Sequence, residues 1–143
     1  MPIECRGPEI EDPCVAKVFS LFPESAREKL FEVRALIFEI GLELPQIGRV
    51  RETLRWGQPA YLTTKPRTGT TLRLGIPEPG WVGVYVHCQT TVIRDFEQRC
   101  PDVFRIEGNR GAHFPADIPV PEAALTHLIR SALLYHSNNR DPS

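Results

Sequence analysis

The chain has 143 residues and a formal net charge of −1, with 41% hydrophobic and 24% charged residues. These values are ordinary for a globular protein, and a chain of this length can bury about 68–70% of its unfolded surface. We expect one domain over residues 1–143, with a core from about 16 to 136 and short flexible ends. The balanced charge disfavours general nucleic-acid binding, and no apolar run is long enough for a membrane span.

The cysteine pattern gives no sign of a metal ribbon or a redox motif. The four cysteines are widely spaced, and no Cys-x-x-Cys pair is present. We therefore expect a cytoplasmic protein with reduced thiols, in which Cys88 and Cys100 are core residues.

Two helices are predicted at the start of the chain. Asp12-Pro13 combines a capping residue with a first-turn proline, and Pro23 begins a longer helix that runs to about Leu42. Two apolar stripes recur along the second helix at helical spacing, so we expect it to pack on two neighbours. The first stripe is Leu30, Val33, Ile37 and Ile40, and the second is Phe31, Ala35, Phe38 and Leu42.

From Val50 onward the hydrophobic period changes to two, which is typical of strands. The predicted strands cover residues 50–56, 60–63, 71–76 and 81–88, with Gly57 and Pro59 interrupting the chain between the first two. In the fourth strand Val82, Val84, Val86 and Cys88 point inward, while Trp81, Gly83, Tyr85 and His87 point outward. A helix after Thr90, short strands near Phe104 and Ala112, and a helix from Pro121 toward His136 complete the chain.

The order of these elements predicts an α+β fold. Helices come first, followed by hairpin-connected strands with one helix between them, and then by a closing helix. Because helices and strands do not alternate, we expect two layers: a mainly antiparallel sheet of about five to six strands, with helices largely on one face.

The second face of this sheet is the predicted binding surface. Arginines and aromatic residues gather there together with Glu107 and His113, and Trp56 and Tyr61 are expected at its rim, near the bend. Guanidinium groups and aromatic walls suit a small anionic or planar ligand. Arginine and aromatic side chains also simply cover open sheet faces, and such a face can be the docking surface of a protein partner or a homodimer. The predicted ligand-binding residues are Arg55, Trp56, Tyr61, Arg73, Trp81, Tyr85, His87 and Arg105.

Two other constellations suggest different chemistry. His87 paired with Glu107 or His113 across strands would make an acid–base pair or part of a metal site, although no spacing motif supports either and no common catalytic motif is present. Carboxylates also form a stripe on the second helix that could bind a hard cation, although a solvated face is the usual explanation. This stripe consists of Glu24, Glu28, Glu32, Glu39 and Glu43.

Residues 52–61, Glu-Thr-Leu-Arg-Trp-Gly-Gln-Pro-Ala-Tyr, resemble the signature strand and bend of the YdhG-like domain of unknown function. Residues 84–88, Val-Tyr-Val-His-Cys, and 104–110, Phe-Arg-Ile-Glu-Gly-Asn-Arg, resemble a branch of the same family, and the likeness runs from about Ala16 to His136. The resemblance implies a small α+β domain, usually bacterial and cytosolic, with no established general activity. Some members have been described as frataxin-like iron-handling proteins, but no motif here matches iron ligands residue by residue. The signature positions that match are Trp56, Gly57, Pro59 and Tyr61.

Our leading hypothesis is a non-catalytic binding module without a cofactor, which holds a small ligand or a partner segment on the arginine and aromatic face. The second hypothesis is an iron-binding or iron-delivery protein that uses Glu24, Glu28 and Glu32. The third is an enzyme that uses His87.

Overall fold

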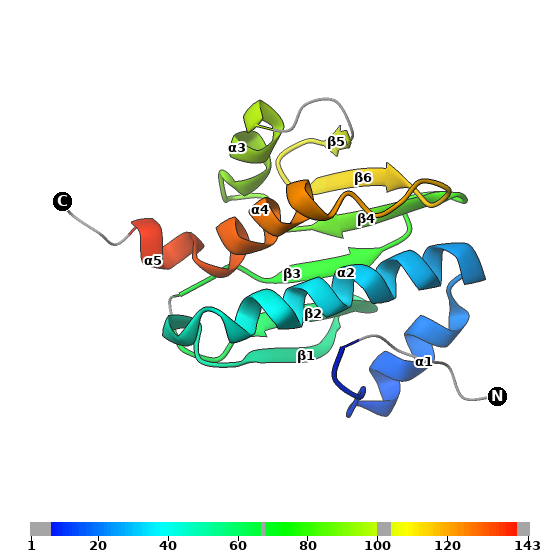
Figure 1. Cartoon of the computed structure of the whole chain (residues 1–143), viewed down its shortest axis with the longest axis horizontal. Helices are drawn as coiled ribbons and strands as arrows, with labels where there is room; N and C mark the ends of the chain where they lie inside the picture. Colours follow the sequence, from blue (N-terminus) through cyan, green and yellow to red (C-terminus); the bar gives the residue numbers. More distant parts are fainter. Residues whose placement is uncertain (1–6, 67, 100–103, 140–143) are drawn as a thin grey trace.

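The computed structural model describes residues 7–66, 68–99 and 104–139 (Figure 1). Two helices open the chain, four strands follow, and a helix, two strands and two helices complete it. The elements are α1 (Pro13–Leu21), α2 (Glu24–Leu42), the 3-10 turn η1 (Pro45–Ile47), β1 (Val50–Arg55), β2 (Gln58–Thr63), β3 (Leu72–Gly75), β4 (Trp81–Tyr85), α3 (Val92–Arg99), β5 (Arg105–Glu107), β6 (Gly111–Pro115), α4 (Glu122–Leu133) and α5 (Tyr135–Asn139).

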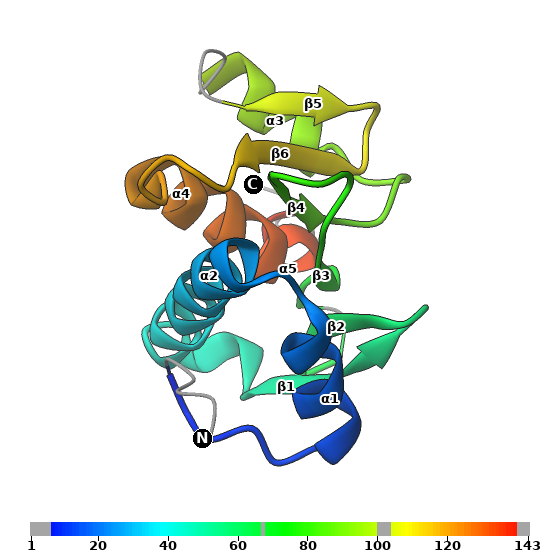
Figure 2. The ribbon, with the colours of Figure 1, turned by 90° about the vertical axis from the view of Figure 1, so that its right-hand side faces the viewer.

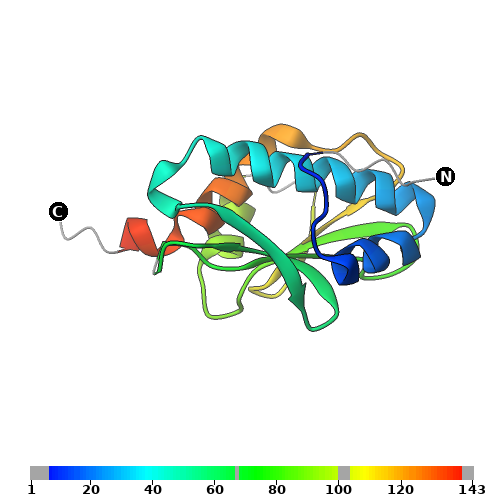
Figure 3. The same cartoon turned by 90° about the horizontal axis from the view of Figure 1, so that it is seen from below.

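The strands form one six-stranded sheet in the order β1-β2-β3-β4-β6-β5, and all neighbouring strands are antiparallel. Figures 2 and 3 show α2 and α4 on one side of this sheet, while the β1–β2 hairpin curls away from them. The predicted α+β class, with a mainly antiparallel sheet, is confirmed. The other side of the sheet, which we call the outer face, lies opposite these two long helices.

The first two helices form where the sequence predicts them. The Oδ1 atom of Asp12 accepts a hydrogen bond of 2.8 Å from the backbone N–H of Cys14 and so caps α1. The first apolar stripe of α2, which ends at Ile40, is buried against the sheet and α4. The prediction fails for Leu42, which is 87% exposed because α2 ends there and the chain turns away toward β1.

The inner face of the sheet supplies the other half of the core. Leu72, Leu74, Val82 and Val84 are fully buried, as the two-residue period predicts. The expectation for Cys88 is wrong, because β4 ends at Tyr85 and Cys88 lies exposed in the following turn.

The remaining predictions at the chain's periphery have mixed outcomes. Cys100 lies outside the described residues. The helix predicted from Pro121 toward His136 ends at Leu133, and His136 belongs to the separate short helix α5 and is exposed. Within the described ranges, none of the helices has the length and apolar character that crossing a membrane requires.

Candidate ligand-binding face of the sheet

Strand pairing brings several of the predicted binding residues together on the outer face. Residues that sit directly opposite each other in an antiparallel sheet point to the same side. The register therefore defines two adjacent rows across the outer face, which place Arg55, Arg73, Tyr85 and Arg105 on one surface as predicted. One row is Thr53, Ala60, Arg73, Tyr85, Gly111 and Glu107, and the other is Arg55, Gln58, Gly75, Gly83, His113 and Arg105.

Glycines form the floor of this surface and let a tyrosine ring lie flat on it. A Cβ atom added at Gly83 would stand 2.6 Å from the Tyr85 hydroxyl oxygen, and one at Gly111 would stand 2.9 Å from the Tyr85 ring. Tyr85 is therefore buried although it belongs to the outer face. Burial raises the pKa of Tyr85, with a further contribution from the Glu107 carboxylate, so its hydroxyl stays protonated at neutral pH.

Arg73 carries the charge at the centre of the outer face. Its guanidinium carbon lies 4.8 Å from the Trp56 ring centroid and 5.8 Å from the Tyr85 centroid, and its Nη1 donates to Gln58 Oε1 at 2.9 Å. Within the described ranges, no carboxylate lies within 4.0 Å of this guanidinium. Burial lowers the pKa of Arg73, and the neighbouring Arg110 adds to the effect, but a guanidinium remains charged at neutral pH. Arg73 is therefore a half-buried cation. Its Nη1 has an acceptor in Gln58, but its Nε–H and Nη2 groups have no protein acceptor within the described ranges.

Trp56 reaches Arg73 from the tip of the β1–β2 hairpin. Arg55 pairs with Gln58, so Trp56 and Gly57 form a two-residue turn, and both have positive φ angles of 50° and 74°. Turns of this geometry favour Asn-Gly, because a bulky residue with positive φ is strained. The indole is nonetheless 81% exposed, so packing of the ring in the core does not account for this choice of residue.

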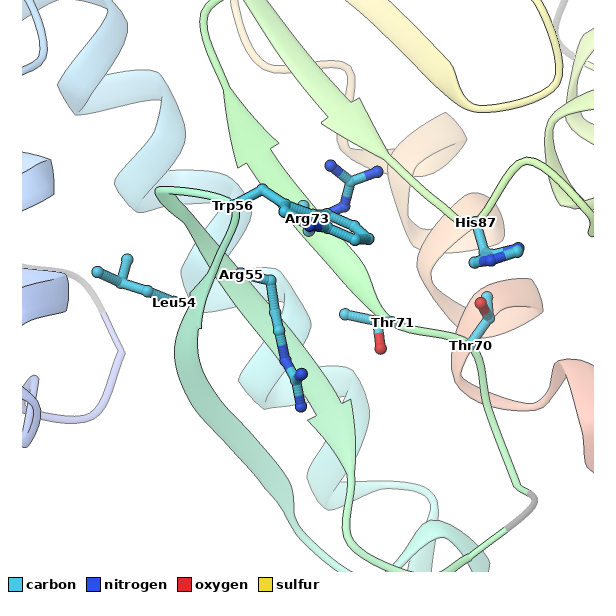
Figure 4. A pocket seen from close by; sticks show the side chains of 7 residues that line it. All are labelled: Leu54, Arg55, Trp56, Thr70, Thr71, Arg73 and His87. Carbon is cyan, nitrogen blue, oxygen red and sulfur yellow. The ribbon is translucent and has the colours of Figure 1, made fainter.

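An open hollow of about 490 Å³ lies beside this pair, and we call it the ring hollow. Figure 4 shows the Trp56 ring over the Arg73 side chain at one side of this hollow, with His87 and Thr70 at the other side. The lining contains two arginines, a histidine and two threonine hydroxyls but no carboxylate, so it favours an anion. The lining residues are Leu54, Arg55, Trp56, Thr70, Thr71, Arg73 and His87.

A smaller hollow of about 250 Å³, which we call the polar hollow, also has Arg73 in its wall. Its lining contains both a carboxylate and guanidinium groups, and Arg110 Nε donates to Glu107 Oε2 at 2.6 Å. Its lining residues are Gln58, Arg73, Tyr85, Glu107 and Arg110. Gln58 and Arg110 were missed from the sequence, although the outward register of the strands adjoining the Trp56-Gly57 turn could have indicated Gln58.

Arg105 and Trp81 form a second stacked pair on the outer face, 4.0 Å from guanidinium carbon to ring centroid. Unlike Arg73, Arg105 is ion-paired, because its Nη1 donates to Glu78 Oε1 at 2.6 Å. Its Nη2 lies 3.5 Å from His113 Nδ1. This pair is therefore a self-contained contact rather than an open anion receptor.

His113, rather than His87, lies beside Glu107. The Nε2 atom of His113 is 3.2 Å from Glu107 Oε1, although the geometry makes no hydrogen bond and this buried nitrogen has none within the described part of the chain. Because arginine only donates, the contact between His113 Nδ1 and Arg105 is a hydrogen bond only in the tautomer that carries its proton on Nε2. Burial lowers the pKa of His113 below its ordinary value. His87 is exposed past the end of β4, where its Nδ1 accepts from the Gln89 backbone N–H at 3.1 Å.

The expectation that Tyr61 lies at the rim of the outer face is wrong. Tyr61 pairs with Glu52 across β1 and β2 on the inner face and is fully buried. Its hydroxyl donates to Glu52 Oε2 at 2.7 Å, and the same carboxylate receives Arg34 Nε at 2.6 Å and Nη2 at 3.0 Å. Burial raises the pKa of Tyr61, with smaller contributions from Glu52. This network pins α2 to the sheet and takes no part in the outer face.

The carboxylate stripe of α2 does not form a cation site in the parts of the chain that the structure describes. Glu24 and Glu28 are exposed, Glu32 is partly buried, and no group of three or more metal-ligating side chains converges within these ranges. A third hollow of about 570 Å³ near α1 has mixed charge, with Glu9, Glu11 and Asp12 close to Arg49 and Arg51.

Comparison with known proteins supports the fold. No protein-family model matches the sequence, and neither does any curated protein. Among solved structures, the chain is similar to the crystal structure of a DUF1801-family protein, YdhG, from Bacillus subtilis, with a TM-score of 0.61 and 15% identity over 90% of this chain and 94% of that chain. The chain thus has the fold of the YdhG-like domain, as the resemblance of its signature residues implied, and at this identity the likeness concerns the fold alone.

Proposed function

We propose that this protein, whose fold is that of the YdhG-like domain, is a non-catalytic binding module for a small anionic ligand that carries a planar ring. The observation that carries the proposal is Arg73, a half-buried cation with no carboxylate partner among the described residues, stacked beneath an exposed indole. Such a guanidinium offers two parallel N–H donors to a carboxylate or phosphate. The ligand's anion would bind these donors, and its ring would lie against Trp56.

The surroundings of Arg73 support this orientation. Arg55 and His87 add positive or hydrogen-bonding groups to the ring hollow, and Thr70 and Thr71 add hydroxyl groups. Gln58 holds Arg73 from the opposite side through the 2.9 Å bond, so part of the cost of ordering the long side chain is met before a ligand arrives. The strained backbone of Trp56 is also typical of a functional position.

Calorimetric titration tests the proposal with three probes: ADP, which has a ring and an anion, adenosine, which has the ring alone, and inorganic pyrophosphate, which has the anion alone. We expect ADP to bind more tightly than either fragment. Replacing Arg73→Gln should weaken ADP binding about 10- to 100-fold, because hydrogen bonds to charged groups contribute about 1.5–3 kcal/mol.

The matched control is Arg94→Gln, which removes an exposed arginine of α3 outside both hollows. We expect it to leave ADP affinity unchanged within about twofold. Equal losses in the two variants would mean that ADP responds only to net charge, and the proposal would be wrong. Absence of ADP binding to the unmodified protein would also overturn it.

A further inference from the structure

We propose that the polar hollow is the second half of the same site, and that the ligand is a nucleoside diphosphate joined to a sugar. This inference rests on the proposed function and extends it by naming the ligand class. The observation behind it is that Arg73 lies in the wall of both hollows.

The shared position of Arg73 determines the order of groups in such a ligand. The ring hollow lies on the side of Trp56, and the polar hollow lies on the side of Tyr85, the two aromatic rings that flank the guanidinium. A ligand that fills both hollows must therefore carry its anionic group between its two halves. A diphosphate that links a base-bearing nucleoside to a second sugar has this order of groups.

The polar hollow suits hydroxyl groups better than a further charge. Glu107 and Arg110 neutralise each other at 2.6 Å, so neither is an uncompensated charge. The Gln58 amide nitrogen remains a donor because its Oε1 already accepts from Arg73, and the Tyr85 hydroxyl both donates and accepts. Donors and acceptors that alternate over a small area match the hydroxyl groups of a sugar, which also donate and accept.

The two hollows also differ in size and charge, as the two halves of a nucleoside diphosphate sugar do. The ring hollow, about 490 Å³, has the exposed indole of Trp56 and two arginines, Arg55 and Arg73, in its lining. The polar hollow is about half as large, about 250 Å³, and has no comparably exposed ring. The base and diphosphate would therefore occupy the ring hollow, and the second sugar would occupy the polar hollow.

Titrations with ADP and ADP-ribose test this assignment, because the two probes share the nucleoside diphosphate and differ by the second sugar. In the unmodified protein we expect ADP-ribose to bind about tenfold more tightly than ADP. Tyr85→Phe removes one hydroxyl and keeps the ring over the glycines, so it should lower the ratio of ADP-ribose affinity to ADP affinity about 2- to 10-fold. Tyr135→Phe, whose hydroxyl contacts the Thr91 backbone outside both hollows, should change neither affinity.

The outcomes separate this inference from the proposed function. Equal affinities for ADP and ADP-ribose, with ADP binding still dependent on Arg73, would overturn the sugar subsite alone. An equal loss of both affinities in Tyr85→Phe would show that the hydroxyl has only a structural role and would also overturn it. If neither probe binds the unmodified protein, the proposed function and this inference both fail.

Discussion

The Arg73 guanidinium stacks on the Trp56 indole across the outer face, with 4.8 Å between the guanidinium carbon and the ring centroid. Trp56 holds this position from a turn in which its φ angle is 50°, a conformation that costs a bulky residue free energy. The stacking itself contributes only about 0.5–1 kcal/mol at an exposed site. Trp56 therefore adds little net stability to the fold. A costly backbone conformation with little gain in stability is expected where a side chain is needed for binding.

Replacing Trp56→Asn should separate stability from binding. Asparagine tolerates a positive φ and is favoured before glycine in this turn, so the free energy of unfolding should stay the same or rise. ADP affinity should fall because the stacking surface is lost. Chemical denaturation together with calorimetric titration checks both effects. A fall of more than about 1 kcal/mol in stability would show that the indole has an important packing role, contrary to this account.

The buried pair of Arg34 and Glu52 should be important for stability. Glu52→Ala leaves the Arg34 charge with its bidentate partner removed and takes the acceptor from Tyr61, at a cost of about 3–5 kcal/mol. Glu78→Ala is the matched control, because it breaks an exposed pair with Arg105 and should cost at most about 1 kcal/mol. Urea denaturation measures both variants. Similar losses in the two would contradict the role assigned to the buried network.

Stability should fall as the pH drops below about 6.5, partly through His113. Burial, the largest cause, lowers the pKa of His113 in the folded protein below its ordinary value of 6.5; Arg105 lowers it further, while Glu107 opposes the shift. Below pH 6.5 the unfolded chain therefore binds a proton that the folded chain does not, so stability rises with pH in this window. The pKa of His127 is also lowered by burial, so it contributes with the same sign.

Denaturation of His113→Gln between pH 7.5 and 5 checks this assignment. We expect a shallower dependence of the unfolding free energy on pH than in the unmodified protein. The control, His136→Gln, removes an exposed histidine of α5. A slope that is unchanged in His113→Gln would show that this histidine titrates alike in the folded and unfolded chains.

Gly83→Ala should push the Tyr85 ring off the floor of the outer face. The added Cβ would stand 2.6 Å from the tyrosine hydroxyl oxygen, and relief of such crowding typically costs about 1–3 kcal/mol. In a Tyr85→Ala background the clash is absent, and alanine in a strand is favoured over glycine by about 0.5–1 kcal/mol. In a double-mutant cycle, Gly83→Ala should therefore lower the free energy of unfolding in the unmodified protein and raise it in the Tyr85→Ala background. Additive effects would contradict the close packing of the ring on the glycine.

Much of the sheet could be predicted because its hydrophobic pattern has a period of two. Val82 and Val84 alternate with Trp81, Gly83 and Tyr85, and the structure buries the first set on the inner face. That alternation fixes the register, because a slip of one residue would expose the valines. The gathering of arginines on the outer face follows from the same pattern.

The errors arise where a turn or a strand end changes the pattern. Gly57 and Pro59 predict a break between two strands, whereas Trp56-Gly57 is a two-residue turn and Pro59 lies inside β2. This turn sets a register in which Tyr61 pairs with Glu52, so the Tyr61 ring lies on the inner face. Cys88 is misplaced because the period alone does not show that β4 ends at Tyr85. The pairing of His113 with Glu107 depends on β5 and β6 being neighbours, which is a property of the whole sheet.

The measurement that tests the central claim most directly is the NMR signal of the Arg73 Nε–Hε group during titration with ADP. Comparison with Arg73→Gln assigns the signal, and the Nε–Hε signal of Arg94 serves as the internal control. We predict that the Arg73 signal shifts progressively and saturates with ADP while that of Arg94 does not move. Saturable ADP binding with no change at Arg73, or equal shifts at the two arginines, would contradict the account.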